Sequence, residues 1–283
     1  PLSPKFTEKE LEKNLDEIQP VAIVTNWELS KKLLSNSIPI ICVEEISTIA
    51  GGCQNYELHH GINHEDICTI LMTSGTTDSP KAVQLTYQNF QSSCKNWNQF
   101  LNFNLNDQFL CCLPLTHVGG LAVLIRALIY GFSVNLSKSF SSDLLYQILS
   151  KDPVSIVSLV PTMLQRIMDQ PDGIRYLKSL RAILLGGGPA SELLLDNCIK
   201  ENLPIIKTYG MTETCSGIVG LWLLEKPEKK HFAGTPFPDV SIKVENEEII
   251  IFGPMVMKGY LNQPASNETH NSKDLGWMDD DGT

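Results

Sequence analysis

The stretch LRAILLGGGPASELLLDNCIKENLPIIKT, residues 180–208, joins two apolar runs through a glycine turn and a helical segment. The two runs, 180–185 and 205–208, are mainly continuous rather than alternating, as in strands that are covered on both faces. Between them, residues 192–202 carry apolar side chains at spacings of three and four, which indicates an amphipathic helix. A strand, helix and strand in this order predict an α/β fold with a mainly parallel sheet.

The same alternation extends upstream through most of the chain. Further apolar runs of the strand type lie at residues 21–24, 38–43, 69–72, 109–113 and 154–159. Helical stripes lie at residues 88–100, 120–130, 144–149 and 161–168. We therefore predict layered, mainly parallel sheets with flanking helices over residues 1–232.

The pattern changes after about residue 227. Residues 241–245 and 248–252 have the composition of two strands around a tight turn at Asn246, and Gly253 and Pro254 follow them. We predict a small β-rich subdomain over residues 233–283.

Composition narrows the class of protein. The 283 residues are 42% hydrophobic and 19% charged, which is typical of a folded globular protein. A net charge of −10 argues against nucleic acid as a partner, because nucleic-acid binders usually carry a basic patch. The longest apolar stretch, 119–134, contains Arg126 and is shorter than the roughly 20 residues of a membrane span. Eight cysteines in a chain without a signal-peptide pattern favour reduced thiols and a cytoplasmic location, while a homo-oligomeric state stays open.

A hydroxyl-rich loop follows the apolar run at residues 69–72. It contains Ser74, Gly75, Thr76 and Thr77 and leads to Lys81. Backbone N–H groups, hydroxyls and a mobile ammonium group suit a polyphosphate. The loop lacks the Gly-Lys-Ser/Thr of a Walker A motif, so an ordinary P-loop nucleotidase is disfavoured. The alternative is a polar turn between two strands.

Two more loops follow apolar runs. In LLGGGPAS, residues 184–191, the glycines allow a flat ligand to lie against bare backbone, although a tight turn from strand to helix would look the same. In KTYGMTET, residues 207–214, an aromatic ring can stack on a base, Thr212 can donate to a phosphate and Glu213 can hold Mg²⁺. Thr212 and Glu213 would equally suit the start of a helix. We expect all three loops to lie along the carboxyl edge of one sheet.

Two of these segments together resemble a known family. TSGTTDSPKAV, residues 73–83, resembles the phosphate-loop signature of the adenylate-forming acyl- and aryl-CoA ligase superfamily, and YGMTET, residues 209–214, resembles its adenylate-binding signature. The resemblance covers about residues 7–282. Within the superfamily, CLPLTHVGGL at 112–121 and LLGGGPAS at 184–191 are most similar to the o-succinylbenzoate-CoA ligases of menaquinone or phylloquinone synthesis.

The resemblance implies two half-reactions, in which ATP adenylates a small carboxylic acid and CoA then displaces AMP to give a thioester. It implies Mg²⁺ as the cofactor, held by Glu213. It assigns ATP and AMP binding to the following residues: Thr73, Ser74, Gly75, Thr76, Thr77, Lys81, Gly186, Gly187, Gly188, Pro189, Tyr209, Gly210, Met211 and Thr212. Lys81, Thr212, Glu213 and His117 would be the catalytic residues.

The resemblance also implies a site for the acyl substrate. His117 would orient the carboxylic acid, with Gly119 and Gly120 beside it. Taken alone, a histidine at the start of a helix is more often a packed or capping residue.

The chain also departs from the family pattern. Asp78 and Ala82 stand where the phosphate loop usually has glycine. GWMDDDG, residues 276–282, resembles the two flanks of a longer segment whose middle contains the Thr-Gly-Asp that binds the AMP ribose. The lysine-bearing C-terminal domain of the family is expected to be absent from this chain. Two alternatives therefore stay open, namely another aryl- or acyl-CoA ligase and a catalytically incomplete adenylate-binding protein.

Overall fold

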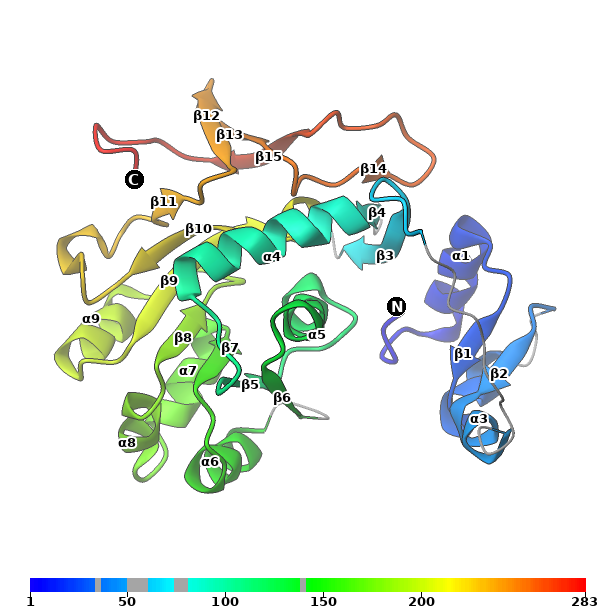
Figure 1. Ribbon diagram of the computed structural model, residues 1–283, viewed down its shortest axis with the longest axis horizontal. Helices are drawn as coiled ribbons and strands as arrows, with labels where there is room; N and C mark the ends of the chain where they lie inside the picture. Colours follow the sequence, from blue (N-terminus) through cyan, green and yellow to red (C-terminus); the bar gives the residue numbers. More distant parts are fainter. Residues whose placement is uncertain (34–36, 50–60, 74–80, 138–140) are drawn as a thin grey trace. The chain divides into compact units, whose positions relative to one another are not determined.

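A computed structural model describes residues 1–33, 37–49, 61–73, 81–137 and 141–283 of the chain (Figure 1). The chain divides into two compact units, Pro1–Asn63 and His64–Thr283. The sequence did not indicate this division, and the predicted boundary between residues 232 and 233 stays a prediction.

The first unit is a small α/β element. Helix α1 (Glu8–Ile18) begins at Thr7, whose side chain and that of Glu10 form a reciprocal capping box. Strand β1 (Ile23–Thr25) pairs in parallel with β2 (Ile40–Cys42), which confirms the two strands predicted here in shortened form. The short helices are α2 (Trp27–Ser30), η1 (Lys31–Leu33) and α3 (Val43–Ile49).

A seven-stranded sheet forms the centre of the second unit. Its order is β11-β10-β9-β8-β7-β5-β6, and the strands from β9 to β6 are parallel. Strand β10 is antiparallel to both of its neighbours. The mainly parallel α/β fold is therefore confirmed. The strands are β5 (Gln108–Cys111), β6 (Ser133–Leu136), β7 (Ile156–Leu159), β8 (Ala182–Leu185), β9 (Ile205–Met211), β10 (Ser216–Trp222) and β11 (Thr235–Pro236).

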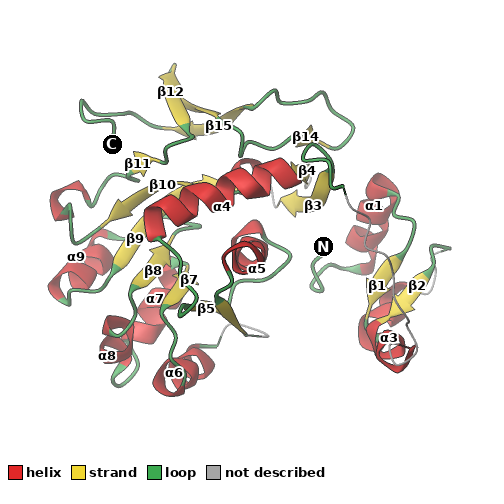
Figure 2. Cartoon of the chain, in the orientation of Figure 1, coloured by secondary structure: helices red, strands yellow, loops and turns green. Residues whose placement is uncertain are grey.

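Helices cover both faces of this sheet (Figures 1 and 2). Along β8, Ile183 and Leu185 pack into the core beneath α6 to α9, whereas Ala182 and Leu184 pack with α4 and α5. This two-sided burial explains why the strands are continuously apolar. The helices are α4 (Tyr87–Leu101), α5 (Val118–Tyr130), α6 (Ser142–Lys151), α7 (Pro161–Met168), α8 (Gly173–Lys178) and α9 (Glu192–Lys200). None of the helices within the described residues has the length and apolar character needed to cross a membrane.

The hydroxyl-rich loop does not leave the main sheet. It joins β3 (Ile67–Thr73) to β4 (Lys81–Thr86), which pair antiparallel in a separate sheet of order β14-β4-β3 with β14 (Gly259–Tyr260). The expectation that three loops share one sheet edge is therefore wrong. Seven residues can join an antiparallel pair, whereas a parallel pair needs a crossover of about a dozen residues or more.

A third sheet confirms the predicted hairpin. Strands β12 (Ser241–Glu245) and β13 (Glu248–Phe252) pair antiparallel with the predicted bounds, and β15 (Thr269–Leu275) pairs with β13. Asn246 and Glu247 have φ of 52° and 67°. Positive φ at both central residues is typical of the type I′ turn that suits a two-residue hairpin.

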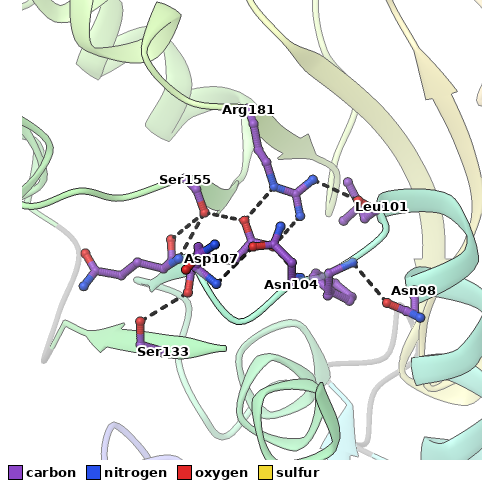
Figure 3. A network of polar contacts seen from close by, with 10 residues as sticks. Asn98, Leu101, Asn104, Asp107, Ser133, Ser155 and Arg181 are labelled. Atoms are coloured by element: carbon purple, nitrogen blue, oxygen red, sulfur yellow. Dashed lines mark hydrogen bonds and ion pairs between the residues drawn. The ribbon is translucent and has the colours of Figure 1, made fainter. Parts of the chain in front are cut away.

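A polar network joins the amino ends of three neighbouring strands in the main sheet (Figure 3). Asp107, before β5, accepts hydrogen bonds from Nε and Nη2 of Arg181, each at 2.6 Å, and from Ser155 Oγ at 2.8 Å. Arg181 precedes β8 and also donates to the Leu101 carbonyl at 2.8 Å, while Ser155 precedes β7. Burial raises the pKa of Asp107, but the hydrogen bonds from Arg181, Asn104 and Ser155 outweigh it and leave that pKa lowered. The network therefore fixes the amino ends of β5, β7 and β8, and the carboxyl end of β8 leads to the glycine turn.

Candidate active site

An open cleft of about 1230 Å³ lies where β8 and β9 end. Its walls include Gly187, Gly188 and Pro189 from the loop after β8, and Tyr209 and Gly210 from β9. The structure thus brings together two of the three predicted loops, although Tyr209 and Gly210 lie within the strand itself. The opposite wall comes from β12, β13 and residues 274–278. A cleft at the carboxyl end of a parallel sheet is the usual place for a ligand in an α/β fold.

The glycine turn has two positions that the fold requires and one that is open. A Cβ atom on Gly186 would lie 2.7 Å from Thr208 Cγ2 and 2.9 Å from the Thr208 carbonyl oxygen. Gly187 has a φ of 73°, a conformation that side chains rarely adopt. A Cβ atom on Gly188 would meet nothing within 4 Å. Packing against Thr208 and backbone conformation therefore explain the first two glycines, whereas Gly188 leaves space in the cleft.

Tyr209 points its hydroxyl toward the end of β15. That hydroxyl donates to Asp274 Oδ2 at 2.7 Å, and burial raises the pKa of Tyr209. Asp274 lines the same cleft but was not among the predicted site residues. It follows Tyr209 by 65 positions, so no local pattern links the two residues, and only the pairing of β15 with β13 reveals their proximity.

The segment after Tyr209 forms a three-residue 3₁₀ turn, η3 (Thr212–Thr214), and then reverses into β10. Thr214 Oγ1 accepts from the Met211 N–H at 3.0 Å, and Cys215 takes a left-handed conformation with φ of 52°. Ser93 on α4 donates to the Cys215 carbonyl at 2.8 Å, and the Met257 N–H donates to the Glu213 carbonyl at 2.8 Å. These contacts fix the backbone of Thr212 and Glu213, which begin a turn rather than a longer helix.

Polar and charged side chains lie close to Glu213. Glu213 Oε1 accepts from the Tyr260 hydroxyl at 2.9 Å, and Lys81 Nζ lies 4.9 Å from the centre of the Tyr260 ring. Burial lowers the pKa of His270 on β15, and the charges that act on it belong to Glu213, Lys81 and Asp274. The fold thus brings the predicted residues Lys81 and Glu213 together with three others. These three, Tyr260, His270 and Asp274, were not identified as site residues from the sequence.

The two residues that flank the hydroxyl-rich loop in the sequence are paired with each other. Thr73 and Lys81 are paired across β3 and β4, so the two ends of the loop lie side by side. Four of the predicted phosphate-binding residues, Ser74, Gly75, Thr76 and Thr77, lie outside the described residues, as does Asp78.

His117 is the N-cap residue of α5, as predicted, but its side chain makes no capping hydrogen bond and the residue is exposed. Neither packing nor capping therefore explains this histidine. Gly120 allows the first turn of α5 to approach the preceding loop, since a Cβ atom there would lie 2.5 Å from the Leu113 carbonyl oxygen. A Cβ atom on Gly119 would lie 3.2 Å from Leu113 Cδ1.

The donor set around Glu213 suits a magnesium ion that arrives with a polyphosphate. Among the described residues, no group of three or more histidine, cysteine, aspartate or glutamate side chains could hold a metal by itself. Mg²⁺ usually keeps several waters and is bound by one or two carboxylates together with substrate phosphates. A single oriented carboxylate beside a lysine fits that pattern.

A further lysine shapes the wall of the cleft. Lys207 Nζ donates to the carbonyl oxygens of Lys230 and Phe232, the latter at 2.6 Å, and burial lowers the pKa of Lys207 to about 8. Lys230 also pairs with Asp196 on α9. These contacts hold the loop at residues 230–234 against the cleft, which it helps to line.

Comparison with known proteins agrees with this geometry. Residues 1–261 match the family described as AMP-binding enzyme. The chain is 32% identical to the 2-succinylbenzoate--CoA ligase of Bacillus cereus ATCC 14579 over 99% of its own length and 60% of the relative. It is 35% identical to the enzyme of that name from Bacillus subtilis 168, over 92% of the chain and 56% of the relative. The chain therefore spans about 60% of the length of these relatives.

Solved structures show the same likeness. The o-succinylbenzoate coenzyme A synthetase (MenE) of Bacillus subtilis in complex with ATP and magnesium superimposes with a TM-score of 0.89 at 32% identity, covering 99% of this chain and 62% of that one. Its complex with the acyl-adenylate intermediate OSB-AMP gives a TM-score of 0.90 at 32% identity and covers 99% of this chain and 77% of that one. With a family match over residues 1–261, the chain belongs to the AMP-binding enzymes.

Proposed function

We propose that this chain forms the adenylate-binding part of an ATP-dependent acid-CoA ligase. The substrate would be o-succinylbenzoate, and the product o-succinylbenzoyl-CoA would serve menaquinone or phylloquinone biosynthesis. The observation that carries the proposal is the cleft between Gly188 and Tyr209, with Lys81 and Glu213 in a charged cluster beside Tyr260. The similarity to 2-succinylbenzoate--CoA ligases supports the choice of acid.

The cleft suggests how the nucleotide would lie. The adenine would fit between the turn at residues 186–189 and the ring of Tyr209, because bare backbone and an aromatic face both accept a flat base. Thr212 would contact the α-phosphate, and Lys81 would contact the β- and γ-phosphates together with residues 73–77. Glu213 would hold Mg²⁺, which would neutralise charge on the leaving pyrophosphate.

The proposed chemistry has two steps. In the first, a carboxylate oxygen of the acid attacks the α-phosphorus of ATP, the bond from that phosphorus to the bridging oxygen breaks, and pyrophosphate leaves. In the second, the CoA thiolate attacks the acyl carbon and AMP leaves. Charge spreads over phosphate oxygens in the first step, so the contribution of this chain is to position the reactants and to stabilise that charge.

His117 is assigned to the acyl substrate. An exposed imidazole that neither caps α5 nor packs in the core is available to orient a carboxylic acid. Gly119 and Gly120 would belong to the same acyl site, where the close approach of Gly120 to the Leu113 carbonyl would fix the first turn of α5 beside His117.

We also propose a cytoplasmic protein whose partners are small molecules. Six of the seven cysteines in the described part of the chain are buried and all seven are unpaired, which suits a reducing compartment. Assembly into a homo-oligomer stays open.

The glycine turn gives a matched pair of variants. Gly188→Val should change the free energy of unfolding by less than about 0.5 kcal/mol, because a Cβ atom there meets nothing, yet it should weaken ATP binding by filling the cleft. Gly186→Ala should instead destabilise the fold by about 1–3 kcal/mol, because its Cβ meets Thr208. Thermal unfolding and calorimetric titration with ATP measure the two effects. Unchanged ATP affinity in a folded Gly188→Val variant would place the base elsewhere.

The product assay tests the function itself. The complete gene product containing this chain is incubated with ATP, Mg²⁺, CoA and a panel of aryl and acyl acids, and thioesters are identified by mass spectrometry. We expect o-succinylbenzoyl-CoA and AMP. Turnover of a different acid would overturn the proposed substrate, while ATP binding without any AMP would favour a catalytically incomplete adenylate-binding protein.

A further inference from the structure

Tyr260 contacts both charged residues of the proposed phosphate site. Its hydroxyl donates to Glu213 Oε1 at 2.9 Å, and its ring faces Lys81 Nζ at 4.9 Å from the centroid. Lys81 and Glu213 both lie within the described residues, and they form no direct ion pair with each other. The aromatic ring thus provides an alternative partner for the ammonium group.

The backbone fixes Tyr260 relative to both residues. Tyr260 pairs with Val83 in the β14 and β4 ladder, two positions after Lys81, and the Leu261 N–H donates to the Ala82 carbonyl at 2.8 Å. Upstream in the same segment, the Met257 N–H donates to the Glu213 carbonyl at 2.8 Å. One short segment therefore holds the start of β4 and the η3 turn in register.

We propose that Tyr260 is a positioning residue that keeps Lys81 and Glu213 apart and orients the Glu213 carboxylate for a metal bound with a polyphosphate. The inference rests on the proposed function. A carboxylate and an ammonium group within about 4 Å of each other attract strongly in a partly buried site. A direct ion pair would therefore occupy the Lys81 ammonium group, which would bind phosphate, and the Glu213 carboxylate, which would bind the metal. Metal-ligating carboxylates are usually held by hydrogen bonds of the type that Tyr260 donates.

Two substitutions separate the two contacts. Tyr260→Phe keeps the ring under Lys81 and removes the hydrogen bond to Glu213, so we expect the apparent affinity for Mg²⁺ in the presence of ATP to fall about tenfold. Tyr260→Leu removes both contacts, so we expect a larger loss, about a hundredfold, and a direct pair between Lys81 and Glu213. Tyr146→Phe is the control, because Tyr146 lies on α6 in an edge contact with Tyr176, and α6 covers the face of the main sheet opposite α4 and α5.

The experiment is calorimetric titration of the complete gene product with ATP at a series of Mg²⁺ concentrations, with ATP turnover measured in parallel. A crystal structure of Tyr260→Leu shows whether Lys81 and Glu213 pair. If Tyr260→Leu does not fold, Tyr260→Phe carries the test alone, with the tenfold loss of Mg²⁺ affinity as the expected result.

The outcomes are distinguishable. A graded loss of Mg²⁺ affinity from Tyr260→Phe to Tyr260→Leu, with Tyr146→Phe unchanged, supports the inference. Normal Mg²⁺ dependence in Tyr260→Phe and in folded Tyr260→Leu overturns it and leaves the proposed function intact. Failure of the unsubstituted protein to bind ATP with Mg²⁺ overturns both.

Discussion

Replacement of Glu213 by glutamine is expected to lower the rate of adenylation by at least about a hundredfold while leaving the fold intact. Loss of a residue that hydrogen-bonds to a metal ligand commonly lowers metal affinity or activity by about tenfold to a hundredfold. Loss of the ligand itself should lower the activity by at least as much. Glutamine keeps the shape of the side chain and can still accept from the Tyr260 hydroxyl, so the packing of η3 should persist. Pyrophosphate release measured against Mg²⁺ concentration checks the rate, and circular dichroism checks the fold.

The matched control is Glu225→Gln, which makes the same chemical change at an exposed position after β10. Its rate and Mg²⁺ dependence should equal those of the unsubstituted protein. Nearly normal adenylation in Glu213→Gln would mean that another group holds the metal, and the proposed role of Glu213 would be wrong.

Replacement of Asp107 by alanine is expected to be the most destabilising of the proposed substitutions, lowering the free energy of unfolding by about 3 kcal/mol. Asp107 is 2% exposed and accepts from Arg181 and Ser155, so its removal leaves a guanidinium group without its buried partner. The midpoint of thermal unfolding should fall by roughly 6–12 °C for a unit of this size.

Glu201→Ala is the control for this change, because it breaks the more exposed pair with Lys178 and should cost less than about 1 kcal/mol. The effect at Asp107 should also depend on pH. The fold lowers the pKa of Asp107, so its charged form stabilises the folded protein. This stabilisation is complete above about pH 4, the pKa of an aspartate in the unfolded chain, and is lost as the pH falls through the lower pKa of Asp107 in the folded protein. Equal effects of Asp107→Ala and Glu201→Ala would show that the network in Figure 3 adds nothing.

Strands β5, β7, β8 and β9 of the main sheet could be predicted because their signal is local. The parallel edge strand β6 was missed, because it is partly exposed and is not a continuous apolar run. A strand buried on both faces, such as β7 or β8, is a continuous apolar run, and the intervening helices carry their own periodicity. The hairpin of β12 and β13 could be predicted for the same reason, because its two strands and their turn lie within twelve consecutive residues.

Strand β10 could not be predicted in the same way. It contains Gly217 and Gly220, which normally weaken a strand. A Cβ atom on Gly217 would lie 2.7 Å from the Trp97 ring, and one on Gly220 would lie 2.8 Å from Phe100 and 2.9 Å from Phe237. The glycines are required because aromatic rings from α4 and from the segment after β11 pack against this strand, and the Thr208 hydroxyl also lies against Gly217. These contacts arise only in the folded protein, so no local pattern in the sequence predicts the strand.

The same distinction applies to the site. Lys81, Tyr209 and Glu213 stand in recognisable local motifs, so they could be predicted as site residues from the sequence. Tyr260 lies 47 positions after Glu213 and Asp274 lies 65 after Tyr209. Their roles depend on how β14 and β15 return to the earlier strands, and no spacing along the chain encodes that.

The most direct test of the proposed function is exchange of labelled pyrophosphate into ATP by the complete gene product, measured with and without o-succinylbenzoate and in the absence of CoA. This measurement isolates the adenylation step, which is the step that the cleft, Lys81 and Glu213 are proposed to serve. We predict exchange that requires both Mg²⁺ and o-succinylbenzoate and that Glu213→Gln suppresses. Absence of exchange, or exchange that is independent of the acid, would contradict the assignment of this chain to acid adenylation.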